Sequence, residues 1–153
     1  YARARLQFGY TPHFLSWANA RHFDCTVSIN SATSVNSTKY IVHGYDDTWN
    51  AIGFKISNGV LYGLCADTSG VTTLALETLS AGTYTVQRAL KCIFTPGVDC
   101  KFYVNGTLVG TITTNLPSGA YGSARLLSLY CSNLALAETK YLYLGNFFLN
   151  VAQ

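Results

Sequence analysis

The chain has 153 residues, of which 49% are hydrophobic and only 11% are Asp, Glu, Lys or Arg. A chain of this length can bury a core as one domain. Its formal net charge of +3 comes from scattered cationic residues, which excludes a protein that binds nucleic acid by electrostatic attraction. No apolar run approaches the ~18 residues of a membrane-spanning helix. We therefore expect a single domain over residues 1–153, with no nucleic-acid partner and no membrane span.

β-Strand signals follow one another from residue 23 onward. Residues 23–29 alternate between apolar and polar side chains, which is the period of a half-buried strand. Asn58-Gly59 and Asn105-Gly106 each separate two strand-like runs and predict tight hairpins, because Asn and Gly tolerate positive φ. Strands are predicted over residues 23–29, 39–45, 52–56, 60–64, 71–76, 84–94, 101–104, 107–112, 126–131 and 140–151, with loops over residues 46–50 and 132–139.

No segment has an amphipathic period of 3.6 that lasts for three helical turns. Many short strands with turns about every ten residues are typical of an all-β sandwich or barrel. Residues 1–20 precede the first predicted strand, and we expect them to form an N-terminal arm or a covering segment. Such a cover would use large apolar side chains at Leu6, Phe8, Tyr10, Phe14 and Trp17.

Three stretches resemble a known family. They are residues 52–62, residues 100–110 with the run Phe-Tyr-Val-Asn-Gly, and residues 113–119 with the run Asn-Leu-Pro. Together they resemble the concanavalin A-like lectin/glucanase domain, also called laminin-G-like, and most closely the copies found in bacteriophage and other prokaryotic-virus structural proteins. The resemblance covers roughly residues 20 to 150 and implies an antiparallel two-sheet jelly-roll sandwich. It implies no particular activity, because this fold carries lectins, hydrolases and scaffolds.

The five cysteines form no Cys-x-x-Cys pair, so a zinc site is not expected. Cys92 and Cys100 flank a predicted turn over residues 95–99 and could face each other diagonally across a hairpin. The alternative is that all five are small buried hydrophobic side chains. The sequence leaves the pairing open among Cys25, Cys65, Cys92, Cys100 and Cys131.

The residues needed for catalysis are missing. Glycoside hydrolysis requires two carboxylates about 5–9 Å apart. Asp46 and Asp47 are the only acids close in sequence, and neighbours in an extended strand point to opposite faces. There is no Gly-x-Ser-x-Gly motif for a nucleophile, and the three histidines lie in different segments. We therefore expect no enzyme, no catalytic residues and no metal centre.

A binding surface remains, and the polar loop over residues 46–50 is the best local candidate. Lectin sites combine an aromatic face for a sugar ring with carboxylates and amides for its hydroxyls. The candidate ligand-binding residues are His43, Tyr45, Asp46, Asp47, Trp49 and Asn50. No cofactor is expected, although the oxygens of Asp46, Asp47 and Asn50 could hold a calcium ion. The alternative is a solvated turn whose Trp49 packs on the sandwich edge.

The low charge predicts assembly between copies, because few charges would lose water when such surfaces meet. Our first hypothesis is a non-catalytic structural domain of a virion or extracellular assembly, of the capsid-decoration or fibre type. It would form a homo-oligomer, a trimer by analogy with virion fibres, with a capsid or fibre protein as its partner. The alternative is a carbohydrate-binding, lectin-like module that attaches a host-recognition protein or an enzyme to glycans. Both hypotheses place the chain on a virion surface or outside the cell.

Overall fold

Within the described residues, the computed structural model has eleven β-strands. The backbone is described for residues 3–10, 17, 20–28, 38–46, 49–79, 87–119, 125–132 and 143–151, and the side chains for Trp17, residues 50–79, residues 87–119 and Gly145. The strands are β1 (Arg3–Tyr10), β2 (Ala20–Ser28), β3 (Thr38–Asp46), β4 (Trp49–Ser57), β5 (Val60–Ala66), β6 (Val71–Thr78), β7 (Arg88–Thr95), β8 (Asp99–Val104), β9 (Thr107–Ile112), β10 (Arg125–Ser132) and β11 (Tyr143–Val151).

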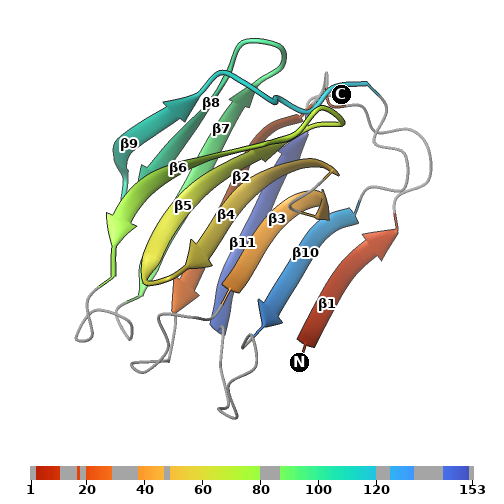
Figure 1. The fold of residues 1–153 in the computed structure, drawn as a ribbon. Helices are drawn as coiled ribbons and strands as arrows, with labels where there is room; N and C mark the ends of the chain where they lie inside the picture. The colour runs from red at the N-terminus through yellow and green to blue at the C-terminus, as the bar shows by residue number, and fades with distance from the viewer. Residues whose placement is uncertain are drawn as a thin grey trace.

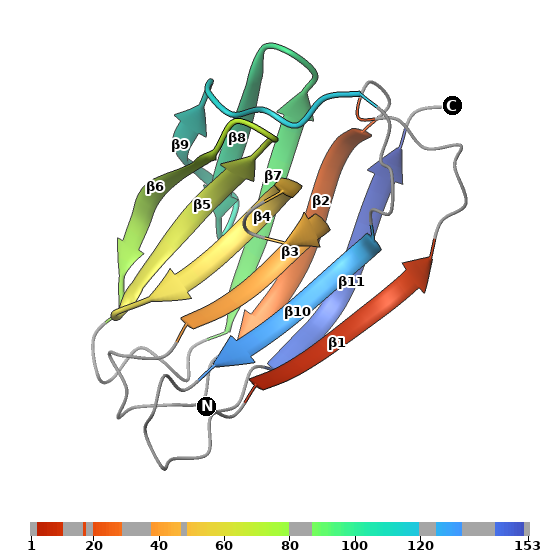
Figure 2. The same ribbon diagram turned by 45° about the vertical axis from the view of Figure 1, so that its right-hand side comes forward.

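The strands form two antiparallel sheets that lie face to face (Figure 1; Figure 2). One sheet has the order β1-β10-β3-β4-β5-β6, and the other has the order β11-β2-β7-β8-β9. Both sheets therefore combine strands from the two ends of the chain with central hairpins. The predicted all-β, antiparallel two-sheet sandwich is confirmed.

The segment expected to be an arm or a cover contributes a strand instead over residues 3–10. This strand, β1, lies at the edge of the six-stranded sheet and pairs with β10, with Arg5 opposite Tyr130. Other predicted boundaries also shift among the described residues. β2 begins at Ala20 and β4 at Trp49, each three residues earlier than predicted, so the predicted loop over residues 46–50 is shorter, because pairing of β3 with β4 continues to Asp46 and Trp49. Residues 84–86 and 140–142, which were predicted as strand, lie outside the described residues. The predicted loop over residues 132–139 lies outside the described residues except for Ser132, which ends β10.

The two Asn-Gly turns have the predicted geometry. The φ angles are 49° and 72° at Asn58 and Gly59, and 50° and 82° at Asn105 and Gly106, so all four residues lie in the left-handed region. Each pair closes a two-residue hairpin, β4–β5 or β8–β9. The second turn is also held to β7. The Asn105 N–H donates to the Ala89 carbonyl at 2.8 Å, and the Ala89 N–H donates to Asn105 Oδ1 at 3.0 Å.

We expect Gly106→Val to lower the free energy of unfolding by about 1–3 kcal/mol, through a strained backbone at a β-branched residue. A Cβ at Gly106 would meet no atom within 4 Å, so we attribute the effect to the positive φ. Chemical denaturation measures it. Gly106→Asn is the control, because Asn tolerates this φ and should leave stability nearly unchanged. Equal losses in the two variants would contradict this explanation.

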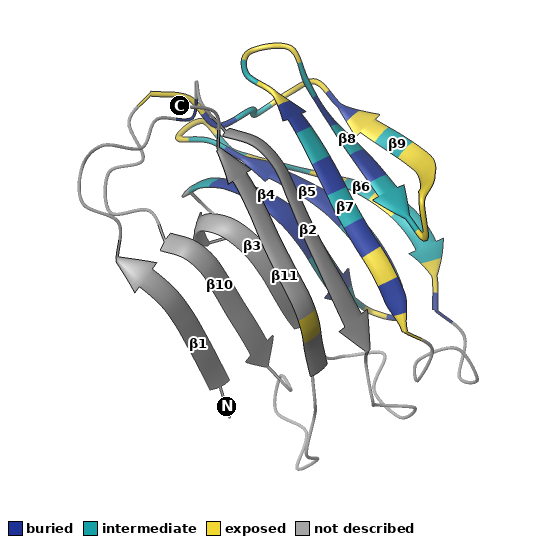
Figure 3. Ribbon diagram, turned by 180° about the vertical axis from the view of Figure 1, so that it is seen from behind, coloured by how far each residue is buried: buried dark blue, intermediate teal, exposed yellow. Residues whose placement is uncertain are grey.

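The core lies between the sheets, and the dark-blue bands of β7 in Figure 3 mark buried residues that alternate with more exposed ones. Aromatic rings fill much of it. The Trp17 and Phe94 centroids are 5.9 Å apart at 82°, and those of Phe54 and Phe102 are 5.6 Å apart at 84°, both edge-to-face arrangements. The core side chains are Trp17, Ile52, Phe54, Ile56, Leu61, Cys65, Leu79, Leu90, Cys92, Phe94, Cys100, Phe102 and Ile112.

Three cysteines belong to this core. Cys65, Cys92 and Cys100 are free thiols with 0% exposure, which confirms for them the prediction of small buried side chains. The side chains of Cys25 and Cys131 lie outside the described residues. Burial raises the pKa of the Cys100 thiol well above its usual range, and hydrogen bonds with the thiols of Cys65 and Cys92 raise it further. Cys92 and Cys100 therefore do meet across the β7–β8 hairpin.

Candidate binding site at one end of the sandwich

The predicted binding residues lie at the end of the β3–β4 hairpin. β3 ends at Asp46 and β4 begins at Trp49, and these two residues are register partners. His43 lies farther into the sheet, opposite Ile52. The side chains of His43, Tyr45, Asp46 and Trp49, and the whole of Asp47, lie outside the described residues. The binding role of these residues stays a prediction, and Asn50 is the one of the six whose side chain is described.

Asn50 connects the predicted loop to a second turn. It is half-buried, and its φ of 39° interrupts the regular strand at the start of β4. The next residue, Ala51, pairs with Ala66 at the end of β5. When this register is continued by one pair, Asn50 lies next to Asp67, which begins the β5–β6 turn. The two turns lie side by side at the same end of the six-stranded sheet.

The β5–β6 turn is organised by Asp67. Its Oδ1 accepts hydrogen bonds from the Ser69 N–H at 2.7 Å and the Gly70 N–H at 3.0 Å. Its own N–H donates to the Gly70 carbonyl at 3.0 Å. Among the described residues no group donates to the second carboxylate oxygen of Asp67. This oxygen remains an acceptor at the surface of the turn, which exposes Thr68 and Ser69.

The segment that follows β9 brings further polar groups to the same place. Thr114 Oγ1 lies 2.8 Å from Thr72 Oγ1, and Asn115 Nδ2 donates to Thr72 Oγ1 at 3.1 Å. Asn115 has a φ of 49°, and its Nδ2 lies 3.3 Å from the point where a Cβ on Gly70 would stand. Loops of both sheets therefore meet here. We call the group the loop cluster; its residues are Asn50, Asp67, Ser69, Thr72, Thr114 and Asn115.

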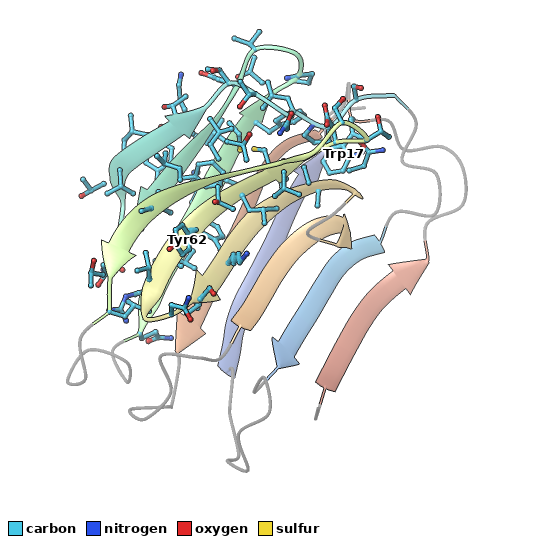
Figure 4. All side chains as sticks on the ribbon, in the orientation of Figure 1. Trp17 and Tyr62 are labelled. Atoms are coloured by element: carbon cyan, nitrogen blue, oxygen red, sulfur yellow. The ribbon has the colours of Figure 1, made fainter. Side chains whose placement is uncertain are left out.

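The end of the sandwich that carries the loop cluster is called the loop end below. Residues 113–119 cross this end, and Figure 4 places Trp17 there as well. The backbone N–H of Trp17 donates to the Gly119 carbonyl at 3.1 Å, while the Trp17 ring is fully buried against Phe94. The polar loop cluster therefore lies directly beyond the aromatic end of the core.

Hydroxyl, amide and carboxylate groups together can donate to and accept from a ligand that carries many hydroxyls. No sequence motif marked Asp67 or Thr72, and residues 113–119 carried the family resemblance without a binding role for Thr114 or Asn115. The contact was not predicted because Thr72 on β6 and Asn115 after β9 are 43 residues apart in the sequence. Among the described residues, no group of three or more His, Cys, Asp or Glu side chains is arranged to hold a metal ion. The part of the chain that the structure describes also contains no long apolar helix of the bilayer-crossing kind.

The other two described carboxylates, Glu77 and Asp99, have contacts of their own. Glu77 accepts two hydrogen bonds from Arg88, at 2.8 Å from Nε and 2.7 Å from Nη2. The hydrogen bond from Arg88 holds the pKa of the Glu77 carboxyl below its usual range. Asp99 lies 3.5 Å from Lys101 Nζ. Both carboxylates therefore take part in ion pairs, as distinct from the open oxygen of Asp67.

The fold of this chain is similar to solved structures of known proteins. No family model matches the sequence. No curated protein matches it either. Among solved structures, the receptor-binding domain of botulinum neurotoxin D matches with a TM-score of 0.68 and 14% identity, over 99% of this chain and 38% of that one. The serotype G binding domain matches with a TM-score of 0.63 and 11% identity, over 97% of this chain and 39% of that one.

A third structure concerns botulinum neurotoxin type C, whose ability to enter cells depends on interaction with two ganglioside molecules. Its TM-score is 0.63 and its identity 12%, over 88% of this chain and 33% of that one. At these identities the likeness shows a shared fold, which agrees with the predicted jelly-roll sandwich. This chain spans little more than a third of the length of those chains, and the ganglioside interaction is a property of the longer toxin. The resemblance to viral structural proteins stays a prediction.

Proposed function

We propose that this chain is a non-catalytic, lectin-like carbohydrate-binding module that holds a glycan at the loop cluster. The observation that carries the proposal is the hydrogen-bonded group of Thr72, Thr114 and Asn115 beside the open carboxylate oxygen of Asp67. Each hydroxyl has one donor and two acceptor positions, so these threonines keep capacity for sugar hydroxyls. The fold supports the proposal, since solved domains with the same fold serve receptor binding.

The same arrangement favours binding over hydrolysis. Glycosidases place two carboxylates on either side of the scissile bond, about 5–9 Å apart. In the loop cluster Asp67 is the single carboxylate, and one of its oxygens is used by the turn. Asn50, at the end of the predicted β3–β4 site, extends the cluster toward that hairpin. The predicted site and the loop cluster would thus form one surface.

Glycan-array screening of the full chain, followed by calorimetry, tests the proposal. We expect saturable binding that Thr114→Val weakens about tenfold, because a lost hydrogen bond is worth about 1 kcal/mol or more and 1.4 kcal/mol is a factor of ten. Thr107→Val is the matched control, because Thr107 is also exposed but lies at the opposite end of β9. No saturable binding to any glycan contradicts the function, and equal effects of the two variants contradict the site.

A second function, assembly between copies, is favoured by exposed apolar side chains on two edge strands. Val71 on β6 is 41% exposed, and Leu108 and Val109 on β9 are 49% and 42% exposed. β6 and β9 are outer strands of their sheets; β9 has no charged side chain, and the one charge on β6, Glu77, is paired with Arg88. Edges of this kind readily pair with another chain. These exposed apolar edges support the proposed homo-oligomer, which would lie on a virion surface or outside the cell. In its most detailed version, this proposal is a trimer that binds a capsid or fibre protein.

Light scattering at micromolar concentration tests this second function. Assembly predicts a mass that is a multiple of 16.6 kDa. Val109→Lys should return the mass to that of one chain, because a charge on an edge strand opposes pairing with another strand. A mass that stays at 16.6 kDa on concentration contradicts assembly and leaves the binding module as the function.

A further inference from the structure

Three thiols from both sheets meet in the core. Cys65 lies on β5 of the six-stranded sheet, and Cys92 and Cys100 lie on β7 and β8 of the five-stranded sheet. All three are free and 0% exposed, and the Cys100 thiol forms hydrogen bonds with the other two. Neither the proposed glycan site nor the assembly surface uses them. Their arrangement decides which pair can be joined covalently.

Gly63 and Phe102 show how closely the two sheets approach here. A Cβ on Gly63 would lie only 2.7 Å from atoms of the Phe102 ring, so the backbone of β5 rests directly on that ring. From Gly63, β5 runs toward the loop end and reaches Cys65 two residues later. β8 starts at the loop end, and Cys100 precedes Phe102 by two residues.

The same two-residue step in both strands therefore leads toward the same end of the sandwich. Because side chains alternate along a strand, Cys65 shares the inner face of β5 with Gly63, and Cys100 shares the inner face of β8 with Phe102. Cys65 and Cys100 consequently face each other between the sheets. Their hydrogen bond agrees with this placement.

Cys92 and Cys100 are related differently. Cys92 pairs with Phe102, and Phe94 pairs with Cys100, so the two cysteines are diagonal neighbours on the β7–β8 hairpin. Diagonal residues have Cα atoms about 7–8 Å apart. A disulfide usually requires about 4.4–6.8 Å. A Cys92–Cys100 bond would have to distort the hairpin. A Cys65–Cys100 bond would join two strands of different sheets beside the close approach of Gly63 to Phe102 and would leave the β7–β8 pairing unchanged.

We propose that Cys65 and Cys100 form a disulfide that joins the two sheets when the chain folds in the presence of glutathione disulfide, and that Cys92 remains a thiol. One protein thiolate attacks the S–S bond of glutathione disulfide, which releases one glutathione thiolate and leaves a mixed disulfide. The second protein thiolate then attacks the protein sulfur of this mixed disulfide and releases the second glutathione. The two protein thiols lose two electrons and two protons, and one glutathione disulfide becomes two glutathione thiols.

The bond forms during folding and not afterwards. In the folded chain the sulfurs are fully buried, and the raised pKa of the Cys100 thiol leaves little of the thiolate that thiol–disulfide exchange requires. The same burial shields the finished disulfide from reductants. A chain folded without an oxidant therefore stays in the three-thiol state and oxidises slowly.

The test uses the full chain, unfolded and reduced, then refolded with either a glutathione redox buffer or dithiothreitol. Free thiols are alkylated, and digestion with mass spectrometry maps the cross-links. We expect one Cys65–Cys100 link after oxidative refolding, and a melting temperature about 10 °C above that of the reduced chain, as a disulfide closing a loop of this length should produce. A Cys92–Cys100 link, a link to Cys25 or Cys131 in its place, or no link in the folded chain overturns the proposal.

Two variants act as a matched pair, since each removes one buried sulfur from the same cluster. Cys92→Ala should keep the cross-link and the rise in melting temperature on oxidation, and Cys100→Ala should lose both. Retention of the full rise by Cys100→Ala overturns the assignment. The mapped cross-link of the wild-type chain decides the question even if either variant fails to fold.

Discussion

Gly63→Ala is expected to lower the free energy of unfolding by about 2–3 kcal/mol, the upper part of the range for overpacking a core. The added methyl group would lie 2.7–2.8 Å from three atoms of the Phe102 ring. This ring is fully buried and is held edge-on by Phe54, so it has no free direction in which to move. Denaturant unfolding measures the loss, and the slope of the transition shows whether the variant still unfolds in one cooperative step.

Gly110→Ala is the control for this prediction. A Cβ there would overlap the end of the Leu74 side chain, which is flexible and only half-buried and can turn to another rotamer. We expect a loss of less than about 1.5 kcal/mol, the cost of an off-rotamer side chain. Combining Gly63→Ala with Phe102→Leu should restore part of the stability that Gly63→Ala loses. Equal losses at the two glycines would show that the clash at Phe102 relaxes easily.

The second large effect is expected at the ion pair that connects β6 to β7. Arg88 is 3% exposed, and Glu77 is 33% exposed. Glu77→Gln keeps the shape of the side chain but removes the charge that compensates the buried guanidinium. Breaking a buried pair typically costs about 3–5 kcal/mol, and the partial exposure of Glu77 reduces our expectation to about 2–3 kcal/mol. Lys101→Met, which breaks the more exposed pair with Asp99, should cost less than about 1 kcal/mol.

The same pair predicts how stability changes with pH. Arg88 lowers the pKa of the Glu77 carboxyl in the folded chain, so the folded state favours the ionised form. The stabilisation is complete above the ordinary glutamate pKa of about 4.3 and is lost as the pH falls through the lowered folded-state value. Unfolding curves from pH 7 to pH 3 should therefore lose this contribution in the wild-type chain. If the stability of the Glu77→Gln chain falls with acid as much as that of the wild-type chain, Glu77 is not the cause of this pH dependence.

The sequence predicted those features that depend on neighbouring residues. The Asn-Gly turns were identified because positive φ at two successive positions selects these residues almost uniquely. The Thr95–Asp99 turn was identified in the same way: Pro96 and Gly97 suit a turn in which Gly97 has a φ of 68° and the Val98 N–H donates to the Thr95 carbonyl at 3.0 Å. Local steric preference decided both, so no knowledge of the fold was needed.

Features that depend on distant residues were missed. The alternation of Ala4, Leu6, Phe8 and Tyr10 was present in the sequence, but nothing local showed that residues 3–10 pair with a strand more than a hundred residues away. The loop cluster was missed for the same reason, since nothing local distinguishes Thr72 on β6 or Asn115 after β9 until the sheets bring them together. The proximity of Cys65 to Cys100 likewise depends on the packing of one sheet against the other.

The pairing of β1 with β10 determines the order in which the sandwich can be completed. Arg3 pairs with Ser132, so β1 leaves the ribosome long before its partner exists. The hairpins from β3 to β6 and from β7 to β9 need only local contacts and can form first. The outer strands must wait, because β11 also pairs with β2 from the start of the chain. Such non-local pairing is typical of β-sandwiches that fold in milliseconds to seconds. During synthesis β1 therefore has no partner strand until residues 125–132 have been made.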